Sequence, residues 1–273
     1  MSDKLQTGLY VVGTPIGNLG DMSARAIETL KSVDIIYAED TRVSKKLLSH
    51  FEIKNKLATL HEHNESEIIE KIVGNIIGGQ AVALITDSGM PAISDPGFKL
   101  VRAMRESGLA VFAVPGPTAF ATAAAISGFP TDRITFCGFL PNKDTARDNM
   151  LREDRRISNT IIYYESPNRL GKTIKALSEI MPERRIAICR EMTKMFEEVA
   201  IGYPADLTAR NDWRGEIVIV IEPTPHKKIS GDELAEIIND ITDKDITTKA
   251  RAALIAQRSG ISKKEAYKKS LKR

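Results

Sequence analysis

Three clusters of acidic and basic side chains each follow a strand-like stretch of the sequence, at residues 38–42, 164–169 and 190–194. Carboxylates can accept or orient a proton, and cationic side chains can stabilise negative charge that develops in a transition state. Because strand ends in an α/β sheet gather at one edge, we expect these clusters to share one cleft. The candidate catalytic residues are Glu39, Asp40, Arg42, Glu165, Arg190, Glu191 and Lys194.

The first of these clusters also has a structural explanation. Asp40 or Thr41 can cap the helix that is expected to follow, and Arg42 can pair with a neighbouring carboxylate. Glu39 is less easily explained in this way, so it keeps its place among the catalytic candidates.

A long loop is expected at residues 84–97, between a strand-like run and a helical pattern that resumes at Phe98. The segment is rich in Gly, Pro, Ser and Asp, and it exceeds the roughly 2–6 residues of a plain strand-to-helix turn. Loops at the carboxyl ends of α/β strands commonly bind small molecules. The segment therefore predicts a ligand site, in which Asp87 has no assigned role and Asp95 is a candidate N-cap of the next helix.

Two further motifs are weaker. Residues 13–18 follow a strand and precede a helix, but they lack Gly-x-Gly-x-x-Gly spacing, so a tight turn explains them as well as a nucleotide site does. Residues 61–65 contain two histidines without the further ligands of a known zinc site, and we expect no bound metal. The GxSxG, HExxH and P-loop motifs are absent, which leaves hydrolase and kinase activities without support.

The candidate residues are positioned by alternating strand-like and helix-like segments over the first 115 residues. This alternation is typical of βαβ units and predicts a mostly parallel sheet. The expected strands are residues 9–12, 33–38, 57–60, 81–86 and 110–114. Helices are expected at residues 24–30, after the cap at Asp40 or Thr41, and through Ile77, where Asn64 and Glu67 are spaced as in a capping box.

Pro115-Gly116-Pro117 interrupts all regular structure, because two prolines around a glycine continue neither a strand nor a helix interior. A helix of small residues, 118–127, and a second α/β pattern follow, with a helix start at Ser166-Pro167. Its strands are expected at residues 134–139, 160–165, 185–190 and 216–222. The fold class is therefore α/β, with an N-terminal domain (1–115), a second α/β domain (118–223) and a basic helical unit (226–273).

The charge of the chain is unevenly distributed. Residues 249–273 hold nine of its 39 lysines and arginines but one of its 36 acids, which leaves 30 basic and 35 acidic residues before them. A basic tail on an acidic body suggests a polyanionic partner, although a solvated charged helix explains it equally well. The tail is expected to form a helix from Thr247 or Thr248 to about Arg258, a turn at Gly260, and a helix opened by Ser262 and Glu265.

The sequence also indicates a compartment. No apolar run approaches the roughly 20 residues that span a bilayer, and no signal-peptide pattern opens the chain. Cys137 and Cys189 form no CxxC pair and are expected to be buried, reduced thiols. These features predict a cytoplasmic protein that does not associate with membranes.

Taken together and in this order, seven motifs resemble the tetrapyrrole-methylase-like family of S-adenosylmethionine (SAM) dependent methyltransferases. Within that family they are similar to the branch that methylates small-subunit ribosomal RNA. The motifs lie at residues 12–19, 39–42, 86–97, 115–119, 164–169, 190–194 and 215–216.

The resemblance implies two α/β domains with SAM in the cleft between them, and a homodimer. It also implies 2′-O-methylation of a cytidine ribose in the decoding region of 16S rRNA in the 30S subunit. By match to the family's motifs, the SAM site would draw on Pro15, Gly89, Met90, Ile93, Ser94, Thr118 and Ala119. Glycine and proline suit loops whose backbone must approach a ligand closely.

A ribose 2′-hydroxyl is a poor nucleophile, so the implied activity requires a base or a cation that stabilises the alkoxide. We expect Lys194 or Arg190 to hold the target phosphate or ribose while an acidic partner accepts the proton. The residues expected to contact RNA are Arg169, Lys263, Lys264, Lys268, Lys269 and Arg273.

Two other functions fit the same fold. One is methylation of a tetrapyrrole or another small molecule, for which the basic third unit would have no use. The other is a non-catalytic RNA-binding or ribosome-assembly role. Comparing methyl transfer to 30S subunits with methyl transfer to a porphyrinoid distinguishes rRNA methylation from small-molecule methylation. A transfer assay with tritiated SAM distinguishes an enzyme from a non-catalytic protein.

Overall fold

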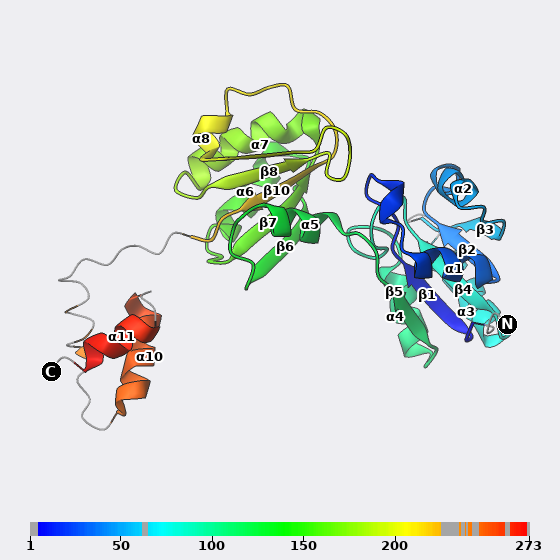
Figure 1. Cartoon of the computed structure of the whole chain (residues 1–273), viewed down its shortest axis with the longest axis horizontal. Coiled ribbons are helices and arrows are strands. Elements are labelled where there is room, and N and C mark those ends of the chain that lie inside the picture. Colours follow the sequence, from blue (N-terminus) through cyan, green and yellow to red (C-terminus); the bar gives the residue numbers. More distant parts are fainter. Residues whose placement is uncertain are drawn as a thin grey trace. The chain divides into compact units, whose positions relative to one another are not determined.

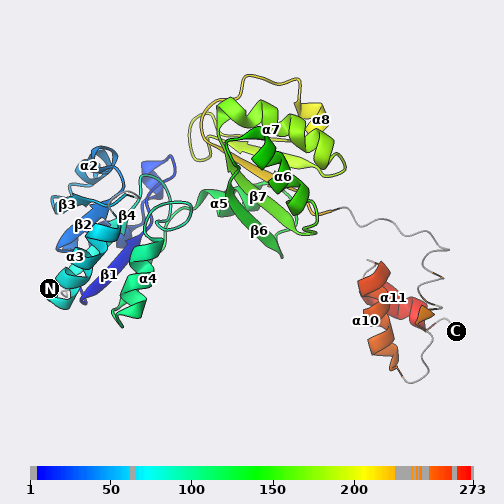
Figure 2. The same cartoon turned by 180° about the vertical axis from the view of Figure 1, so that it is seen from behind.

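The computed structural model describes residues 5–61, 65–224, 235, 238, 240–241, 246–259 and 263–271. The chain divides into two compact units, residues 1–223 and residues 224–273. The first unit contains two five-stranded sheets, which Figures 1 and 2 show from opposite sides. Pro115-Gly116-Pro117 lies between the last strand of the first sheet and the first helix of the second half.

The first sheet is formed by parallel strands in the order β3-β2-β4-β1-β5, which confirms the parallel sheet predicted from the sequence. Its strands are β1 (Gly8–Val12), β2 (Ile35–Ala38), β3 (Lys56–Thr59), β4 (Ala81–Ile85) and β5 (Val111–Val114). The central strand β4 is buried along its whole length, as expected of a parallel strand with both faces covered.

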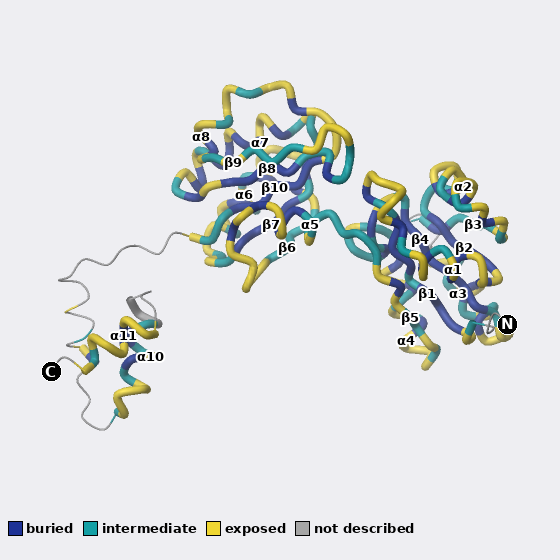
Figure 3. The backbone as a smooth tube through the Cα atoms, in the orientation of Figure 1, coloured by how far each residue is buried: buried dark blue, intermediate teal, exposed yellow. Residues whose placement is uncertain are grey.

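Helices cover both faces of this sheet, and their outer sides are exposed (Figure 3). They are α1 (Ala24–Ser32), α2 (Thr41–His50), α3 (Glu65–Ile77) and α4 (Phe98–Glu106), with a 3-10 turn, η1 (Leu19–Asp21). Leu30 of α1 and Leu48 of α2 pack in one core. Ile76 of α3 and Leu100 of α4 pack in the core of the other face. This layering leaves the carboxyl ends of the strands at one edge of the sheet.

The second sheet is mixed, in the order β6-β7-β10-β8-β9. Its strands are β6 (Ile134–Phe139), β7 (Thr160–Glu165), β8 (Ile186–Arg190), β9 (Glu198–Gly202) and β10 (Ile217–Ile221). Only β6 and β7 are parallel; the other neighbours are antiparallel. Sequence reasoning missed β9, because this edge strand is only partly buried and lacks a continuous apolar run.

Helices also cover both faces of the second sheet. They are α5 (Ala119–Ile126), α6 (Asp144–Asp154), α7 (Pro167–Ile180) and the short α8 (Pro204–Leu207). Leu151 of α6 and Leu170 of α7 pack in one core, and Ala123 of α5 packs in the other. As predicted, α7 begins with a proline in its first turn. Sequence reasoning missed α6, since it has few apolar residues beyond Met150 and Leu151.

The second unit contains α10 (Thr248–Ser259) and α11 (Lys263–Ser270), which pack against each other. Ile255 and Ala266 are fully buried in its small core. The Thr247 hydroxyl accepts a hydrogen bond from the Ala250 amide at 3.3 Å, which confirms the predicted start of the first helix. Gly260 and Ser262, the predicted turn and capping-box residues, lie outside the described residues.

Both cysteines are free thiols. Cys189 is buried, as predicted, whereas Cys137 is half-buried. Burial raises the pKa of Cys137 to about 11 and the pKa of Cys189 to about 12, so both thiols are protonated at neutral pH. Of the helices that the structure describes, none has the length and hydrophobicity needed to cross a membrane.

Candidate functional site

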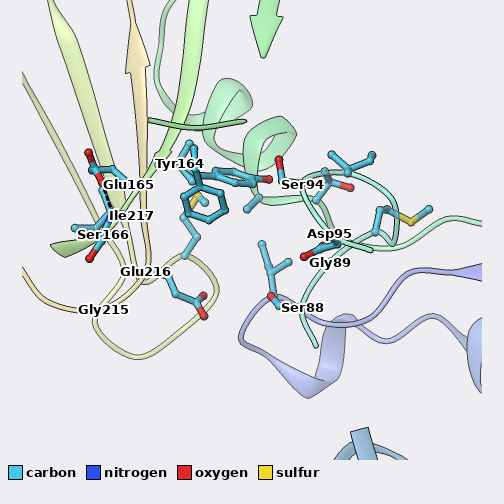
Figure 4. Close-up of a pocket in the computed structure, with 18 of the residues that line it drawn as sticks. Ser88, Gly89, Ser94, Asp95, Tyr164, Glu165, Ser166, Gly215, Glu216 and Ile217 are labelled. Atoms are coloured by element: carbon cyan, nitrogen blue, oxygen red, sulfur yellow. Dashed lines mark hydrogen bonds between the residues drawn. The ribbon is translucent and has the colours of Figure 1, made fainter. Parts of the chain in front are cut away.

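A cavity of about 340 Å³ lies where loops from both halves of the first unit meet. Its lining comes from the loop after β4, the start of α5, the end of β7 and the segment that enters β10 (Figure 4). Its size falls within the range of about 300–1,000 Å³ that is usual for small-molecule sites. The lining residues are Ile16, Ser88, Gly89, Met90, Ile93, Ser94, Asp95, Thr118, Ala119, Phe139, Tyr164, Glu165, Ser166, Pro167, Met192, Gly215, Glu216, Ile217 and Val218.

The turn after β1 is bonded to the loop after β4. The Thr14 amide donates to the Gly89 carbonyl at 2.9 Å, and the Gly89 amide donates to the Thr14 carbonyl at 3.2 Å. The buried Thr14 hydroxyl also donates to the Thr86 carbonyl at 3.1 Å. These bonds fix the loop at residues 84–97, which forms one wall of the cavity, against the turn after β1.

Gly13 and Gly116 make a close backbone contact beside the cavity. A Cβ on Gly13 would lie 2.6 Å from the Gly116 nitrogen and 2.7 Å from the Met90 sulfur. A Cβ on Gly116 would lie 2.8 Å from the carbonyl carbon of Gly13. Only glycine fits at either position, because the opposing atoms belong mostly to the backbone and cannot move aside.

Strained backbone conformations occur in two of the loops at this site. Ala92 and Ser94 have φ values of 67° and 61° in the loop after β4, and Glu191 and Thr193 have φ values of 50° and 67° after β8. A left-handed conformation is unfavourable for residues other than glycine, and it persists only where surrounding contacts require it. Its presence in both loops is typical of a functional site.

The structure brings together six of the seven residues predicted to bind SAM. Gly89, Met90, Ile93, Ser94, Thr118 and Ala119 all line the cavity. The seventh, Pro15, is not among the lining residues, although its neighbour Ile16 is. Four of these residues precede Pro115-Gly116-Pro117 and two follow it. A ligand in the cavity would therefore contact both halves of the first unit.

Of the candidate catalytic residues, only Glu165 lines the cavity, and its carboxylate is already fully engaged. Arg169 lies 2.5 Å from Glu165 Oε1, the Ser166 amide donates to the same oxygen at 2.6 Å, and the Thr173 hydroxyl donates to Oε2 at 2.7 Å. The Glu165 side chain is 1% exposed. The same Arg169 guanidinium donates to the Leu140 carbonyl at 3.1 Å, which does not favour the predicted contact with RNA.

Lys194 is held by two carboxylates next to the cavity. Its Nζ lies 2.8 Å from Glu191 Oε1 and 3.2 Å from Glu216 Oε2. Hydrogen bonds from Lys194 and the Glu216 amide lower the pKa of Glu191. Partial burial tends to lower the pKa of Lys194, but its bonds to the two glutamates outweigh this, and the pKa is raised. A Cβ on Gly17 would lie 2.7 Å from Lys194 Cγ, so Lys194 also packs on the turn after β1.

Arg190 belongs to a separate ion-pair network. Its Nε donates to Glu198 Oε2 at 2.7 Å, and Arg210 donates to the same oxygen at 2.9 Å. Hydrogen bonds from Arg210 and then Arg190 lower the pKa of Glu198 to about 2. Both cations that were expected to hold the target phosphate or ribose, Arg190 and Lys194, are therefore paired with carboxylates.

The cluster after β2 has a largely structural role. Asp40 caps α2 by accepting from the Arg42 amide at 2.8 Å, and the Arg42 guanidinium lies 2.7 Å from the same carboxylate. Bonding to Arg42 lowers the pKa of Asp40 to about 2. Glu39 accepts from the Thr86 hydroxyl at 3.2 Å. The expectation that all strand-end clusters line one cleft is therefore corrected, since these side chains lie outside the cavity lining.

Several residues that line the cavity were not among the predicted site residues, and Asp95 is the most unusual of them. Asp95 was a candidate helix cap, but that assignment is wrong because Gly97 is the N-cap of α4. Burial, with the nearby charge of Glu39, raises the pKa of Asp95 to about 6. Tyr164, Met192 and residues 215–218 also line the cavity. The motif at 215–216 signalled the last segment, and Asp95 lies in the loop at residues 84–97 that predicts a ligand site, although no catalytic role is predicted for it.

The described part of the chain contains no group of three or more His, Cys, Asp and Glu side chains that could hold a metal ion. Glu62 and His63, from the segment with two histidines, lie outside the described residues.

The fold agrees with comparisons to known proteins. The chain belongs to the tetrapyrrole (corrin/porphyrin) methylase family, whose model matches residues 8–208. The protein is therefore a methyltransferase. Among solved structures, uroporphyrin-III-C-methyltransferase from Thermus thermophilus is 19% identical with a TM-score of 0.55, and covers 80% of this chain and 94% of its own. The methyltransferase CobJ is 18% identical with a TM-score of 0.60, over 82% of this chain and 97% of its own. These likenesses show the fold.

Closer relatives carry a more specific name. A protein of Xylella fastidiosa called ribosomal RNA small subunit methyltransferase I is 40% identical over 95% of this chain and 97% of its own length. A protein of Escherichia coli O157:H7 with the same name is 38% identical over 99% of this chain and 96% of its own length. The similarity thus extends through both units of the chain.

Proposed function

We propose that this protein transfers a methyl group from SAM to the 2′-oxygen of a cytidine ribose in the decoding region of 16S rRNA, within the small ribosomal subunit. The observation that carries the proposal is the 40% identity to a ribosomal RNA small subunit methyltransferase I over 95% of the chain. Homodimer formation, which the family resemblance implies, and a cytoplasmic location, which the sequence features indicate, remain predictions. Sedimentation velocity of the purified protein would test the first of them.

The cavity fits SAM in size and in the character of its lining. Ile16, Met90 and Ile93 offer apolar contacts, while the loops around Gly89 and Thr118 bring backbone close to the space. Tyr164 adds an aromatic ring whose hydroxyl accepts from the Phe120 amide at 3.3 Å. When bound, SAM supplies an electrophilic methyl group on a sulfonium. The lining residues would orient that methyl group and exclude water, which is the main requirement of methyl transfer.

Filling the cavity is expected to prevent SAM binding. Ala119 lines the cavity at the start of α5, so the Ala119→Phe side chain would occupy part of the space. We expect the dissociation constant for SAM to rise at least about tenfold in isothermal titration calorimetry. The control is Ala121→Phe, an identical change at an exposed position of the same helix, which should bind SAM like the wild type. Equal affinity in both variants would place the SAM site elsewhere.

The second unit offers a surface for rRNA. Lys263, Lys264, Lys268 and Lys269 are all exposed on α11. Exposed cations of this kind neutralise phosphates and release counterions, which makes binding dependent on salt. Arg273, which was also expected to contact RNA, lies outside the described residues. We therefore assign the polyanionic partner suggested by the basic tail to the rRNA of the small subunit.

Removing the four positive charges of α11 should weaken binding to 30S subunits and reduce its dependence on salt. In a variant with all four lysines changed to glutamine, we expect the slope of log K against log salt concentration to decrease in magnitude by about 3. Filter binding at several salt concentrations measures this slope for the wild type and the variant. The matched control changes four exposed lysines of the first unit, Lys31, Lys45, Lys46 and Lys71. The same loss of slope in both variants would mean that α11 has no special role.

Methyl incorporation from tritiated SAM tests the proposed function directly. The acceptors are 30S subunits from a strain that lacks this protein and, in parallel, a porphyrinoid. We expect incorporation into the 30S subunits and a new 2′-O-methyl group on one cytidine of the decoding region when the rRNA is mapped. Incorporation into the porphyrinoid alone would support small-molecule methylation, and incorporation into neither would support a non-catalytic role.

A further inference from the structure

The carboxylates that line the cavity differ in whether a cation is paired with them. They belong to Asp95, Glu165 and Glu216. Glu165 is buried against Arg169 and two further donors. Glu216 is 67% exposed and paired with Lys194 at 3.2 Å. Each of these two carboxylates therefore already has a cation as a partner.

Asp95 has a different environment. Among the described residues, no cation forms an ion pair with it, and the acids Glu39 and Asp87 lie close enough to raise its pKa through their charges. The groups that face it are Glu39 after β2, Thr86 and Asp87 after β4, and Tyr164 of β7. A side-chain hydrogen bond with Thr86 opposes this rise in the pKa of Asp95, and the Thr86 hydroxyl also lies 3.2 Å from Glu39 Oε2. Burial and like charges together leave Asp95 with a pKa of about 6.

The phenol of Tyr164, which also lines the cavity, is unsuitable as a base. Burial raises the pKa of the Tyr164 phenol above its usual value, so this group stays protonated at neutral pH. Figure 4 shows Asp95 on the loop side of the cavity, with Tyr164 and Glu216 on the other side. Asp95 is therefore placed to meet a hydroxyl group that enters between the two halves.

We propose that the Asp95 carboxylate accepts the proton of the ribose 2′-hydroxyl during methyl transfer. This inference rests on the proposed function. The 2′-oxygen forms a bond to the methyl carbon while the bond from that carbon to sulfur breaks, and the electron pair of that bond remains on sulfur. The hydroxyl proton passes to Asp95, which releases it to solvent after the product leaves. A base with a pKa close to the working pH combines a large deprotonated fraction with useful basicity.

The decisive variant is Asp95→Asn, which keeps the size of the side chain and removes its basicity. We expect the single-turnover rate of methyl transfer to 30S subunits, at saturating SAM, to fall by about 100-fold or more. The affinity for SAM, measured by calorimetry, should change by less than about twofold. The matched control is Asp87→Asn, a neighbouring acid outside the cavity lining, which should reach the wild-type plateau rate at high pH.

The pH dependence separates a catalytic role from a structural one. The wild-type single-turnover rate should rise with pH through about 6, because Asp95 is deprotonated above that value. Glu39→Gln keeps an oxygen that can accept from Thr86 but removes the neighbouring charge, so this rise should move to lower pH. In Asp95→Asn the rise should be absent.

Three results would overturn the assignment of Asp95. They are a wild-type rate in Asp95→Asn, an unchanged pH profile in that variant, and a pH profile that does not move in Glu39→Gln. If Asp95→Asn does not fold, the pH profile of Glu39→Gln still tests the assignment of Asp95. If the wild type itself transfers no methyl group to 30S subunits, the proposed function fails; if the wild type and Asp95→Asn transfer it equally well, only the assignment of Asp95 fails.

Discussion

Replacing Gly13 by valine is expected to abolish methyl transfer. A Cβ at this position would lie 2.6 Å from the backbone nitrogen of Gly116, a distance that real side chains do not reach. The backbone after β1 and the Pro115-Gly116-Pro117 segment would have to move apart, and the cavity residues Gly89 and Thr118 would move with them. Because a displacement of about 1 Å can cost about 100-fold in rate, we expect at least that loss in single-turnover methyl transfer.

Gly74 provides the matched control for this prediction. It lies on α3, it is exposed, and a Cβ there would meet no atom within 4 Å. Gly74→Val should therefore keep the wild-type rate of methyl transfer and the wild-type affinity for SAM. Full activity in Gly13→Val would show that the contact between Gly13 and Gly116 does not organise the site.

Replacing Glu165 by alanine is expected to lower the stability of the fold, because Glu165 has a structural rather than a catalytic role. The change would leave the partly buried Arg169 without its carboxylate and the buried Thr173 hydroxyl without its acceptor. Removing one partner of a buried ion pair typically costs about 3–5 kcal/mol. We expect a loss of that size in the free energy of unfolding, measured by urea denaturation monitored by fluorescence or circular dichroism.

Glu179, an exposed glutamate on the same helix as Arg169, is the control for this substitution. Glu179→Ala should change the free energy of unfolding by less than about 0.5 kcal/mol. A Glu165→Ala variant with wild-type stability and no methyl transfer would contradict the structural role and restore Glu165 as a candidate base.

Local sequence signals predicted most of the fold. β6 and β7 begin and end at the predicted residues, because each is a short apolar run followed by clear turn signals. The edge strand β9 and the helix α6 escaped prediction, since each buries too little apolar surface to leave a clear pattern. The length and composition of the loop at residues 84–97 predict a ligand site, and six of the predicted cofactor residues line one cavity.

The α/β class, the order of most elements and the loops that line the cavity can be predicted from the sequence, because they depend on local spacing and composition. Which charged groups already have partners is visible only in the three-dimensional arrangement. Glu165, Arg190 and Lys194 are paired, and the charge of Asp40 is held by Arg42. Asp95 instead has burial and neighbouring acids, contributed by two strand ends that are distant in the sequence. A pKa depends on distances and burial in three dimensions, and the linear sequence does not contain them.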